Sequence, residues 1–417
     1  MSRPSAIVLC RVATGLAVVR SLASRGIGVH AVLFAADDPL HYSRFGVKVK
    51  YYEHRNQTTE AGTLQEQDAK DALADFLFEY ASRLGDHPLI IPTCDENALL
   101  LAKHRLRLSR VSRIWSTPYD HLSDIIKKDA LYRIAIDHGI PVLPSLSGQD
   151  YEGVEMWTAQ YSGPYLLKPT YHQANTSHLG TKNKVIATRE DLLHYVKHHG
   201  VKSLVIQLFR WGGDGEIYDA YGLCNSHGQV VTIASHRRIR QCAPNLGATS
   251  YGEIPAQIPE GEDALFGITS KLLSVLTFHG IFGIEWLRDR ETGQLYLIDF
   301  NARPFLSIGH LVDCGLDLPW LAYRDLMGDD LVDVDLKPRL KHRYWVDLLR
   351  DVQGFRAKAP NRPIAWDWAS SLLKVSSHAY WSWRDPGPAL MRLGAAARGG
   401  MGAIGKAFGK VGTADGL

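Results

Sequence analysis

The sequence predicts an α/β domain on an open, mostly parallel sheet, followed by a larger α+β region. Two observations predict this order. Short apolar runs alternate with helical segments in the first part of the chain, whereas residues 165–304 contain mainly short β-rich runs separated by glycines. A chain of 417 residues is also long for a single hydrophobic core, so we expect more than one domain.

The first part of the chain contains two β-α-β-like units. Residues 6–10 are an apolar run typical of a buried strand, a turn with Gly15 follows, and residues 16–24 have helical spacing before a second strand within 26–33. The next unit combines a helix, a buried strand and another helix, at residues 68–84, 88–92 and 97–106. Together these segments predict the open parallel sheet.

The middle of the chain begins with an amphipathic segment at 121–139, which we predict as one helix ended by Pro141 and Pro144. Six strands are predicted beyond it, at 165–168, 203–209, 217–222, 229–234, 280–287 and 295–300, with helices at 189–199 and 260–278. After about residue 330 the composition changes to an aromatic-rich stretch and a Gly/Ala tail. Residues 394–411 contain Lys406 and Lys410 and no acid, which suits an anionic membrane surface, although their glycine content favours a frayed tail.

The charge and cysteine content exclude several classes of protein. The 47 basic and 44 acidic residues interleave along the chain, which argues against a nucleic-acid binder with one basic stripe. The five cysteines are scattered without a Cys-x-x-Cys pair, as is typical of a reducing cytoplasm, where we place the protein. No apolar run approaches the ~20 residues of a membrane span, and Arg11 interrupts the apolar start, which favours a buried strand and helix over a signal peptide.

The most informative segment is a predicted hairpin near residue 290. One strand carries Glu285, the next carries Asp299 and Asn301, and Thr292-Gly293 lies at the turn between them. Because side chains alternate along a strand, Asp299 and Asn301 share one face, and the hairpin brings Glu285 roughly opposite them. Two carboxylates and an amide in one place suit Mg²⁺, which prefers oxygen ligands. The alternative is a surface hairpin with two solvated acids, which the apolar flanks at 284, 297, 298 and 300 disfavour.

Gly280-x-x-Gly283-x-Glu285, followed by Asp299-x-Asn301-x-Arg303, resembles the metal-binding end of the ATP-grasp superfamily. This resemblance implies a pre-ATP-grasp Rossmann-like domain at 1–115 and an ATP-grasp fold with a small lobe at 116–205 and a large lobe at 206–330. Residues 331–417 would be a C-terminal helical and aromatic extension. The implied metal ligands, for Mg²⁺ or Mn²⁺, are Glu285, Asp299 and Asn301, with Asp299 standing where glutamate is commoner.

The resemblance also implies a nucleotide site that binds ATP between the lobes. Lys128 resembles the first ATP-contacting lysine of the family, and Lys168 in Leu-Leu-Lys-Pro resembles the second. Residues 171–184 stand where the family has a mobile loop over the triphosphate. Residues 203–209 resemble the hinge strand that reads adenine. The nucleotide contacts implied around that strand are Gln207, Phe209 and a ribose-binding acid, either Asp214 or Glu216, with Glu216 favoured.

The segment from His236 to Gly247 resembles an Arg-Gln-x-Pro-x-x-Gly segment of a bacterial subgroup that includes D-aspartate ligase-like enzymes. Arginines there would neutralise charge moving onto the γ-phosphate. Alternation on a strand predicts that Arg238 and Arg240 share a face while Arg237 points away. We therefore predict Arg238 and Arg240 as catalytic cations, together with Arg303 of the Asp299-x-Asn301-x-Arg303 motif.

The function implied by the resemblance is ligation of a carboxylic acid to an amine, such as an amino acid, through an acylphosphate, with release of ADP and phosphate. The partners would be the two small molecules, with no nucleic acid, and a homodimer could form. One alternative is a non-catalytic nucleotide-binding protein of a surface-polymer or natural-product pathway. A nicotinamide-dependent oxidoreductase is disfavoured, because residues 11–16 lack the Gly-x-Gly-x-x-Gly turn that approaches a pyrophosphate.

Overall fold

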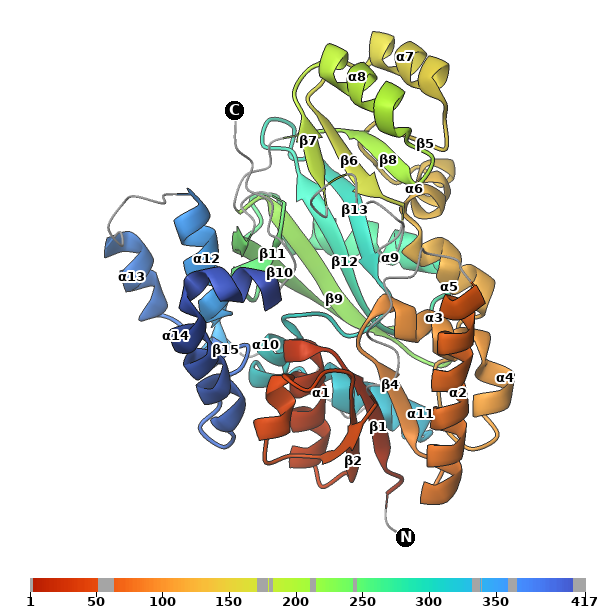
Figure 1. The fold of residues 1–417 in the computed structure, drawn as a ribbon, viewed down its shortest axis with the longest axis vertical. Helices are drawn as coiled ribbons and strands as arrows, with labels where there is room; N and C mark the ends of the chain where they lie inside the picture. The colour runs from red at the N-terminus through yellow and green to blue at the C-terminus, as the bar shows by residue number, and fades with distance from the viewer. Residues whose placement is uncertain are drawn as a thin grey trace.

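In the part of the chain that it describes, the computed structural model contains three β-sheets, which lie one after another along the long axis of the molecule (Figure 1). A parallel sheet from the first part of the chain lies at one end and a small antiparallel sheet at the other, with the largest sheet between them. The structure describes residues 3–51, 64–170, 179, 183–210, 215–242, 246–331, 338, 340–358 and 366–407.

The N-terminal sheet has the strand order β3-β2-β1-β4, and its strands are all parallel, as the β-α-β pattern predicts. Helix α1 packs on one face and α2 on the other, so the sheet has a core on each side. Gly15 permits the close contact of α1 with β1, because a Cβ there would lie 2.8 Å from Cα of Cys10. The elements are β1 (Ala6–Cys10), α1 (Val12–Ser24), β2 (Val29–Leu33), η1 (Pro39–Tyr42), β3 (Val47–Lys50), α2 (Leu64–Leu84), β4 (Leu89–Pro92), α3 (Asp95–Lys103) and α4 (Arg105–Leu108).

The segment predicted as one helix at 121–139 forms two, α5 (Tyr119–Ile126) and α6 (Lys128–Asp137). Lys127 between them is extended, with φ −78° and ψ 118°. The backbone N–H of Lys128 donates to the carbonyl of Thr170 at 2.9 Å, an interaction that an uninterrupted helix would not allow. The single-helix prediction is therefore wrong, and the break makes Lys128 the first residue of α6.

The small sheet is antiparallel, with the order β5-β8-β6-β7. Helices α7 and α8 cover one face through an apolar core, which leaves the other face turned toward the large sheet (Figure 1). Helix α8 has the predicted bounds. The elements are β5 (Ser145–Ser147), α7 (Tyr151–Gln160), β6 (Tyr165–Pro169), β7 (Lys184–Ile186), α8 (Arg189–His199) and β8 (Leu204–Leu208).

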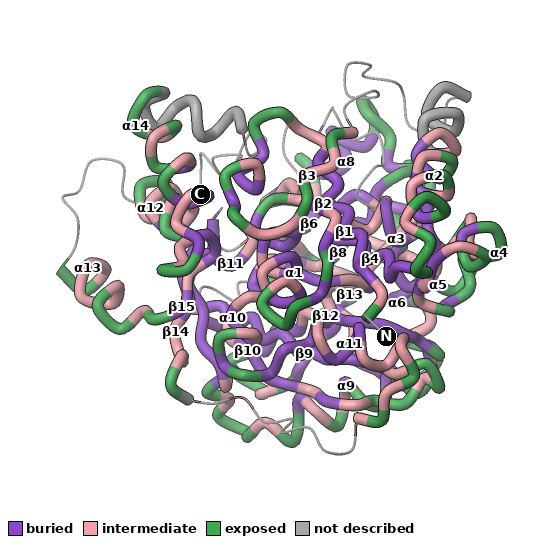
Figure 2. The backbone as a smooth tube through the Cα atoms, turned by 90° about the horizontal axis from the view of Figure 1, so that it is seen from below, coloured by how far each residue is buried: buried purple, intermediate pink, exposed green. Residues whose placement is uncertain are grey.

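Among the described residues, the large sheet has seven strands in the order β13-β12-β9-β10-β11-β14-β15. Helix α9 packs on one face with α5 and α6, and helices α10 and α11 pack on the other beside α1. Its central strands are mostly buried (Figure 2). The elements are β9 (Ile217–Cys224), β10 (Val230–Cys242), β11 (Ala248–Glu253), α9 (Glu262–Leu276), β12 (Gly280–Arg288), β13 (Leu295–Asn301), α10 (Ile308–Asp313) and α11 (Leu318–Leu326).

The C-terminal region adds strands β14 (Tyr344–Val346) and β15 (Ser377–His378) to the large sheet, next to β11. Its helical elements are η3 (Leu340–His342), α12 (Leu348–Lys358), α13 (Trp366–Leu372) and α14 (Gly387–Ala407). The region is therefore continuous with the large sheet. Within the described part of the chain, no helix is both long enough and apolar enough to cross a bilayer.

Asp351 of α12 attaches this region to the sheet. The buried carboxylate accepts hydrogen bonds from Arg240 Nε at 2.9 Å and Nη2 at 2.7 Å, from Ser250 Oγ at 2.8 Å and from Trp368 Nε1 at 2.8 Å. One side chain thus joins β10, β11, α12 and α13, and its loss would leave buried Ser250 and the half-buried Arg240 and Trp368 without this partner.

We predict that Asp351→Ala lowers the free energy of unfolding by about 3 kcal/mol, because the partly buried Arg240 loses the carboxylate that neutralises its charge. Urea denaturation followed by tryptophan fluorescence measures this. The exposed Asp367 of α13 provides the control, since Asp367→Ala should change stability by less than about 0.5 kcal/mol. Equal stability of the two variants would contradict the role given to Asp351.

Candidate active site

The centre of the candidate site is the hairpin of β12 and β13. Asp289 closes its turn by accepting from the backbone N–H groups of Glu291 and Thr292 at 2.9 and 3.0 Å. The resulting register pairs Glu285 with Asp299 and Gly283 with Asn301. Directly paired residues of antiparallel strands share a face, so the two carboxylates and the amide lie together, as predicted. Asn301 Nδ2 donates to Glu285 Oε1 at 3.1 Å.

Each carboxylate of this pair contacts one cation. Lys128 Nζ lies 2.8 Å from Asp299 Oδ1, and Arg238 Nη2 lies 2.7 Å from Glu285 Oε1. Burial alone would lower the pKa of Lys128, but Asp299 and Glu285 raise it above its ordinary value. Burial opposes the charge of Arg238 in the same way, and the carboxylates of Asp219 and Glu285 raise the pKa of Arg238 well above its usual range. Both cations therefore stay charged beside the acids.

Besides Glu285, Arg238 also contacts Asp219 of β9, whose side chain has no exposed surface. Arg238 Nη2 donates to Asp219 Oδ1 at 2.6 Å and Arg238 Nε to Oδ2 at 3.0 Å. His236 Nδ1 and the hydroxyl of Tyr221 also contact Asp219 Oδ2, at 2.8 and 2.9 Å. Burial would raise the pKa of Asp219, but the charge of Arg238 and the hydrogen bonds from His236 and Arg238 lower it to about 2.

The small sheet contributes Lys168 and Gln207, which lie on neighbouring strands β6 and β8. Lys168 Nζ donates to Gln207 Oε1 at 2.8 Å and to the hydroxyl of Tyr132 at 3.4 Å. The Tyr132 hydroxyl in turn donates to the carbonyl of Ile298 in β13 at 2.7 Å. Through Tyr132, Lys168 is linked to the strand that carries Asp299. Lys128, Lys168, Gln207 and the acid pair thus form one connected group.

Two of the predicted nucleotide contacts have partners outside this group. Glu216 is bound by arginines, with Arg290 Nε 3.0 Å from its Oε1 and Arg288 Nη1 3.3 Å from its Oε2. Phe209 is buried at the end of β8, where its N–H donates to the carbonyl of Pro164 at 2.8 Å. Asp214 lies outside the described residues, as does the segment 171–184 apart from residues 179, 183 and 184.

Arg240 and Arg303 each pair with an acid other than Glu285 or Asp299. The pairing of β10 with β11 shifts register between Arg238 and Arg240, and Arg240 binds Asp351 rather than the acids beside Arg238. The simple alternation predicted for these arginines does not bring them together, because the bulge interrupts it. Arg303 Nε lies 2.9 Å from Asp95 Oδ1, at the start of α3, and thereby joins the large sheet to the N-terminal domain.

Sequence reasoning assigned no role to Asp219, Tyr132 or Asp95. Asp219 did leave a signal, because it is a lone acid within the apolar strand 217–222, and a buried carboxylate requires a cationic partner. Tyr132 and Asp95 left none, since their partners Ile298 and Arg303 are more than a hundred residues away in sequence.

The donor set can be compared with the needs of a divalent cation. Among the residues that the structure describes, no group of three His, Cys, Asp or Glu side chains is placed to hold a metal. Mg²⁺ bound with a nucleotide usually takes one or two protein carboxylates and completes its shell with phosphates and water. The half-buried pair Glu285 and Asp299, with the amide of Asn301, fits that requirement.

Comparison with solved structures identifies the fold. The chain superposes on the biotin carboxylase domain of Hydrogenobacter thermophilus 2-oxoglutarate carboxylase with a TM-score of 0.61 and 15% identity, over 82% of this chain and 74% of that one. Staphylococcus aureus N5-carboxyaminoimidazole synthetase, complexed with ADP, gives 0.59 and 16% identity over 81% and 82%. No family model and no curated protein matches the sequence. The fold is a pre-ATP-grasp domain followed by an ATP-grasp fold, as predicted.

We predict that Asp219→Asn destabilises the protein in a pH-dependent way. A carboxyl whose folded pKa of about 2 lies below its unfolded value stabilises the fold above about pH 4 and loses that contribution as pH falls toward 2. The stability gap between wild type and variant should therefore narrow by about 2 kcal/mol over this range. Urea titrations at several pH values measure it. The exposed Asp137 provides the control variant Asp137→Asn, and a stability gap for Asp219→Asn that does not change with pH would refute the assignment.

Proposed function

We propose that the protein is an ATP-dependent ligase that joins a carboxylic acid to an amine and releases ADP and phosphate. The observation that carries this proposal is the carboxylate pair Glu285 and Asp299, flanked by Lys128 and Arg238 and facing a small lobe that carries Lys168. The shared fold supports it, since solved structures of this fold contain ADP or ATP. Within this fold, the segment 236–247 favours the D-aspartate ligase-like subgroup.

In this proposal the nucleotide lies between the small and large lobes. Lys128, Lys168 and Gln207 would bind it, and Glu285, Asp299 and Asn301 would hold Mg²⁺ or Mn²⁺, which offsets the negative charge of the phosphates. Arg238 is positioned by Asp219 to contribute a second positive charge at the same place. Fixed cations suit phosphoryl transfer, which requires positioning and charge neutralisation rather than a protein nucleophile.

The proposed reaction has two steps. In the first step, an oxygen of the substrate carboxylate attacks the γ-phosphorus of ATP, and the bond from that phosphorus to the β,γ-bridging oxygen breaks. ADP is the leaving group, and the product is an acylphosphate. The amine nitrogen then attacks the acyl carbon, the bond from that carbon to the phosphate oxygen breaks, and the nitrogen loses a proton as the amide forms. The direct test is phosphate release from Mg²⁺-ATP over a panel of acids crossed with amino acids, with mass detection of the amide.

A non-catalytic nucleotide-binding protein is the second candidate. It is favoured by one observation, that both acids of the pair already have a cationic partner. Nucleotide binding without turnover on any acid and amine of the panel would support it.

The biotin carboxylase domain of the Hydrogenobacter enzyme is a dimer in its structure, and a homodimer is likewise part of our proposal for this chain.

We expect Glu285→Gln to lower ATP-dependent phosphate release at least about 100-fold, because the amide removes the charge that holds the metal and Arg238. The measurement is phosphate release under saturating Mg²⁺-ATP with the best acid and amine pair. Glu291→Gln changes an exposed acid at the turn of the same hairpin and should retain wild-type activity. Full activity of Glu285→Gln would remove this residue from the site.

Lys128→Met should weaken binding of Mg²⁺-ATP about tenfold or more, since one charge-assisted contact to phosphate is lost. The shift in melting temperature with increasing Mg²⁺-ATP measures this without turnover. Lys127→Met, at the exposed neighbouring residue, should bind like wild type. If both variants bound equally well, the assignment of Lys128 to the nucleotide would be wrong, whether or not the protein is an enzyme.

A further inference from the structure

We propose that the protein docks on an anionic membrane surface through one face at the start of α14. The face consists of four exposed apolar or aromatic side chains and three exposed arginines around them. We call this surface the α14 face. Its residues are Tyr42, Arg44, Trp383, Arg384, Leu390, Leu393 and Arg398.

The apolar and aromatic side chains of the α14 face are exposed. Trp383 is 87% exposed, Tyr42 59%, Leu390 56% and Leu393 43%. Leu390 and Leu393 are three residues apart on α14, and Gly394 and Ala397 continue the same side of the helix, so they form one stripe. Large apolar side chains gathered on one exposed face mark an interaction surface.

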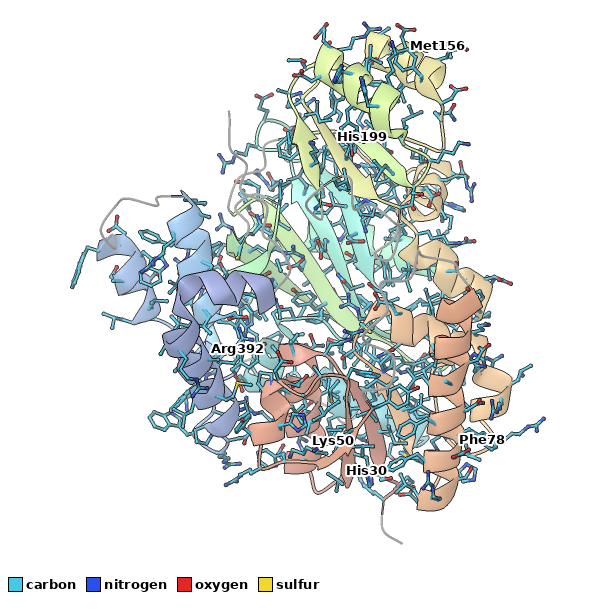
Figure 3. The ribbon with its side chains drawn as sticks, in the orientation of Figure 1. His30, Lys50, Phe78, Met156, His199 and Arg392 are labelled. Atoms are coloured by element: carbon cyan, nitrogen blue, oxygen red, sulfur yellow. The ribbon has the colours of Figure 1, made fainter. Side chains whose placement is uncertain are left out.

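The opposite side of α14 is packed against the body of the protein. Ala389 belongs to the core of the N-terminal domain, and buried Arg392 places its guanidinium 3.9 Å from the centre of the Tyr380 ring. Figure 3 labels Arg392 on this helix, next to the N-terminal domain. Because one side of the helix is already packed, the stripe with Leu390 and Leu393 has to remain outside.

Hydrogen bonds hold the separate pieces of the α14 face together. Buried Asp385 follows Trp383 and Arg384, and it accepts from Arg20 Nε at 2.9 Å, Ser43 Oγ at 2.7 Å and the N–H of Arg44 at 2.9 Å. The first residue of α14, Gly387, approaches η1 so closely that a Cβ would lie 2.1 Å from the carbonyl oxygen of Tyr42. Segments 42–44 and 383–393 therefore form one rigid platform.

The charge of this region indicates which partner covers the platform. Arg44, Arg384 and Arg398 are exposed, whereas the acid among them, Asp385, is buried. From residue 386 to 414 the sequence has four basic residues and no acid, and Asp37, shortly before η1, is an exposed acid among the described residues. Tryptophan and leucine on one side, with arginines at the rim and little negative charge, is the composition of helices that lie in the headgroup layer of an anionic bilayer.

The experiment is flotation of the full chain with vesicles of phosphatidylcholine alone, or of phosphatidylcholine and phosphatidylglycerol at roughly 7:3. We expect flotation with the anionic vesicles and much less with the neutral ones. Leu390→Gln with Leu393→Gln should lower partitioning at least about tenfold, and Arg384→Gln about fivefold. Leu373→Gln, at an 84% exposed leucine after α13, should float like wild type and serves as the matched control.

Absence of flotation with anionic vesicles, equal flotation with neutral vesicles, or an equal loss in Leu373→Gln would overturn the proposal. Light scattering tests the rival occupant, a second copy of the chain. A dimer that the leucine double variant disperses would assign the face to that copy and also overturn the proposal. If the double variant failed to fold, Arg384→Gln and the salt dependence of wild-type flotation would decide, because high salt must weaken an electrostatic contact with the headgroups.

Discussion

Two carboxylates on neighbouring strands, both largely removed from water, require positive charge beside them, and much of the site follows from this constraint. Glu285 and Asp299 are paired across β12 and β13, and each contacts one cation. The cations come from different parts of the chain, Lys128 from α6 and Arg238 from β10. The positions of α6 and β10 are thus constrained by charge as well as by packing.

The same need for partners extends outward from the pair. Arg238 is oriented by buried Asp219, which is itself held by His236 and Tyr221. On the other side, Arg303 after β13 binds Asp95 of the N-terminal domain. Each of these buried or half-buried charges has a partner of opposite charge, and the Arg303–Asp95 pair joins the end of β13 to the N-terminal domain. Such a network gives the acids a defined environment even though the elements that form it are distant in sequence.

The sequence predicts local features well and distant ones poorly. The parallel sheet, the bounds of α8 and the pairing of Glu285 with Asp299 follow from periodicities and turn chemistry that act over a few residues. The break at Lys127 does not, because it depends on a hydrogen bond to Thr170 of the small lobe. The engagement of Arg240 by Asp351 depends on a bulge and on a helix more than a hundred residues away. The position of Glu216 after the predicted hinge strand likewise gives no indication of its arginine partners at 288 and 290.

Lys128 connects the two lobes through two different groups of one residue. Its backbone N–H is hydrogen-bonded to Thr170, at the end of β6 in the small lobe, and its ammonium group contacts Asp299 in the large lobe. A rigid rotation of one lobe against the other would have to stretch or swing this short link. A change in the angle between the lobes would therefore move the Lys128 ammonium group relative to Asp299. The same motion would change the electrostatic potential at the Asp299 carboxylate.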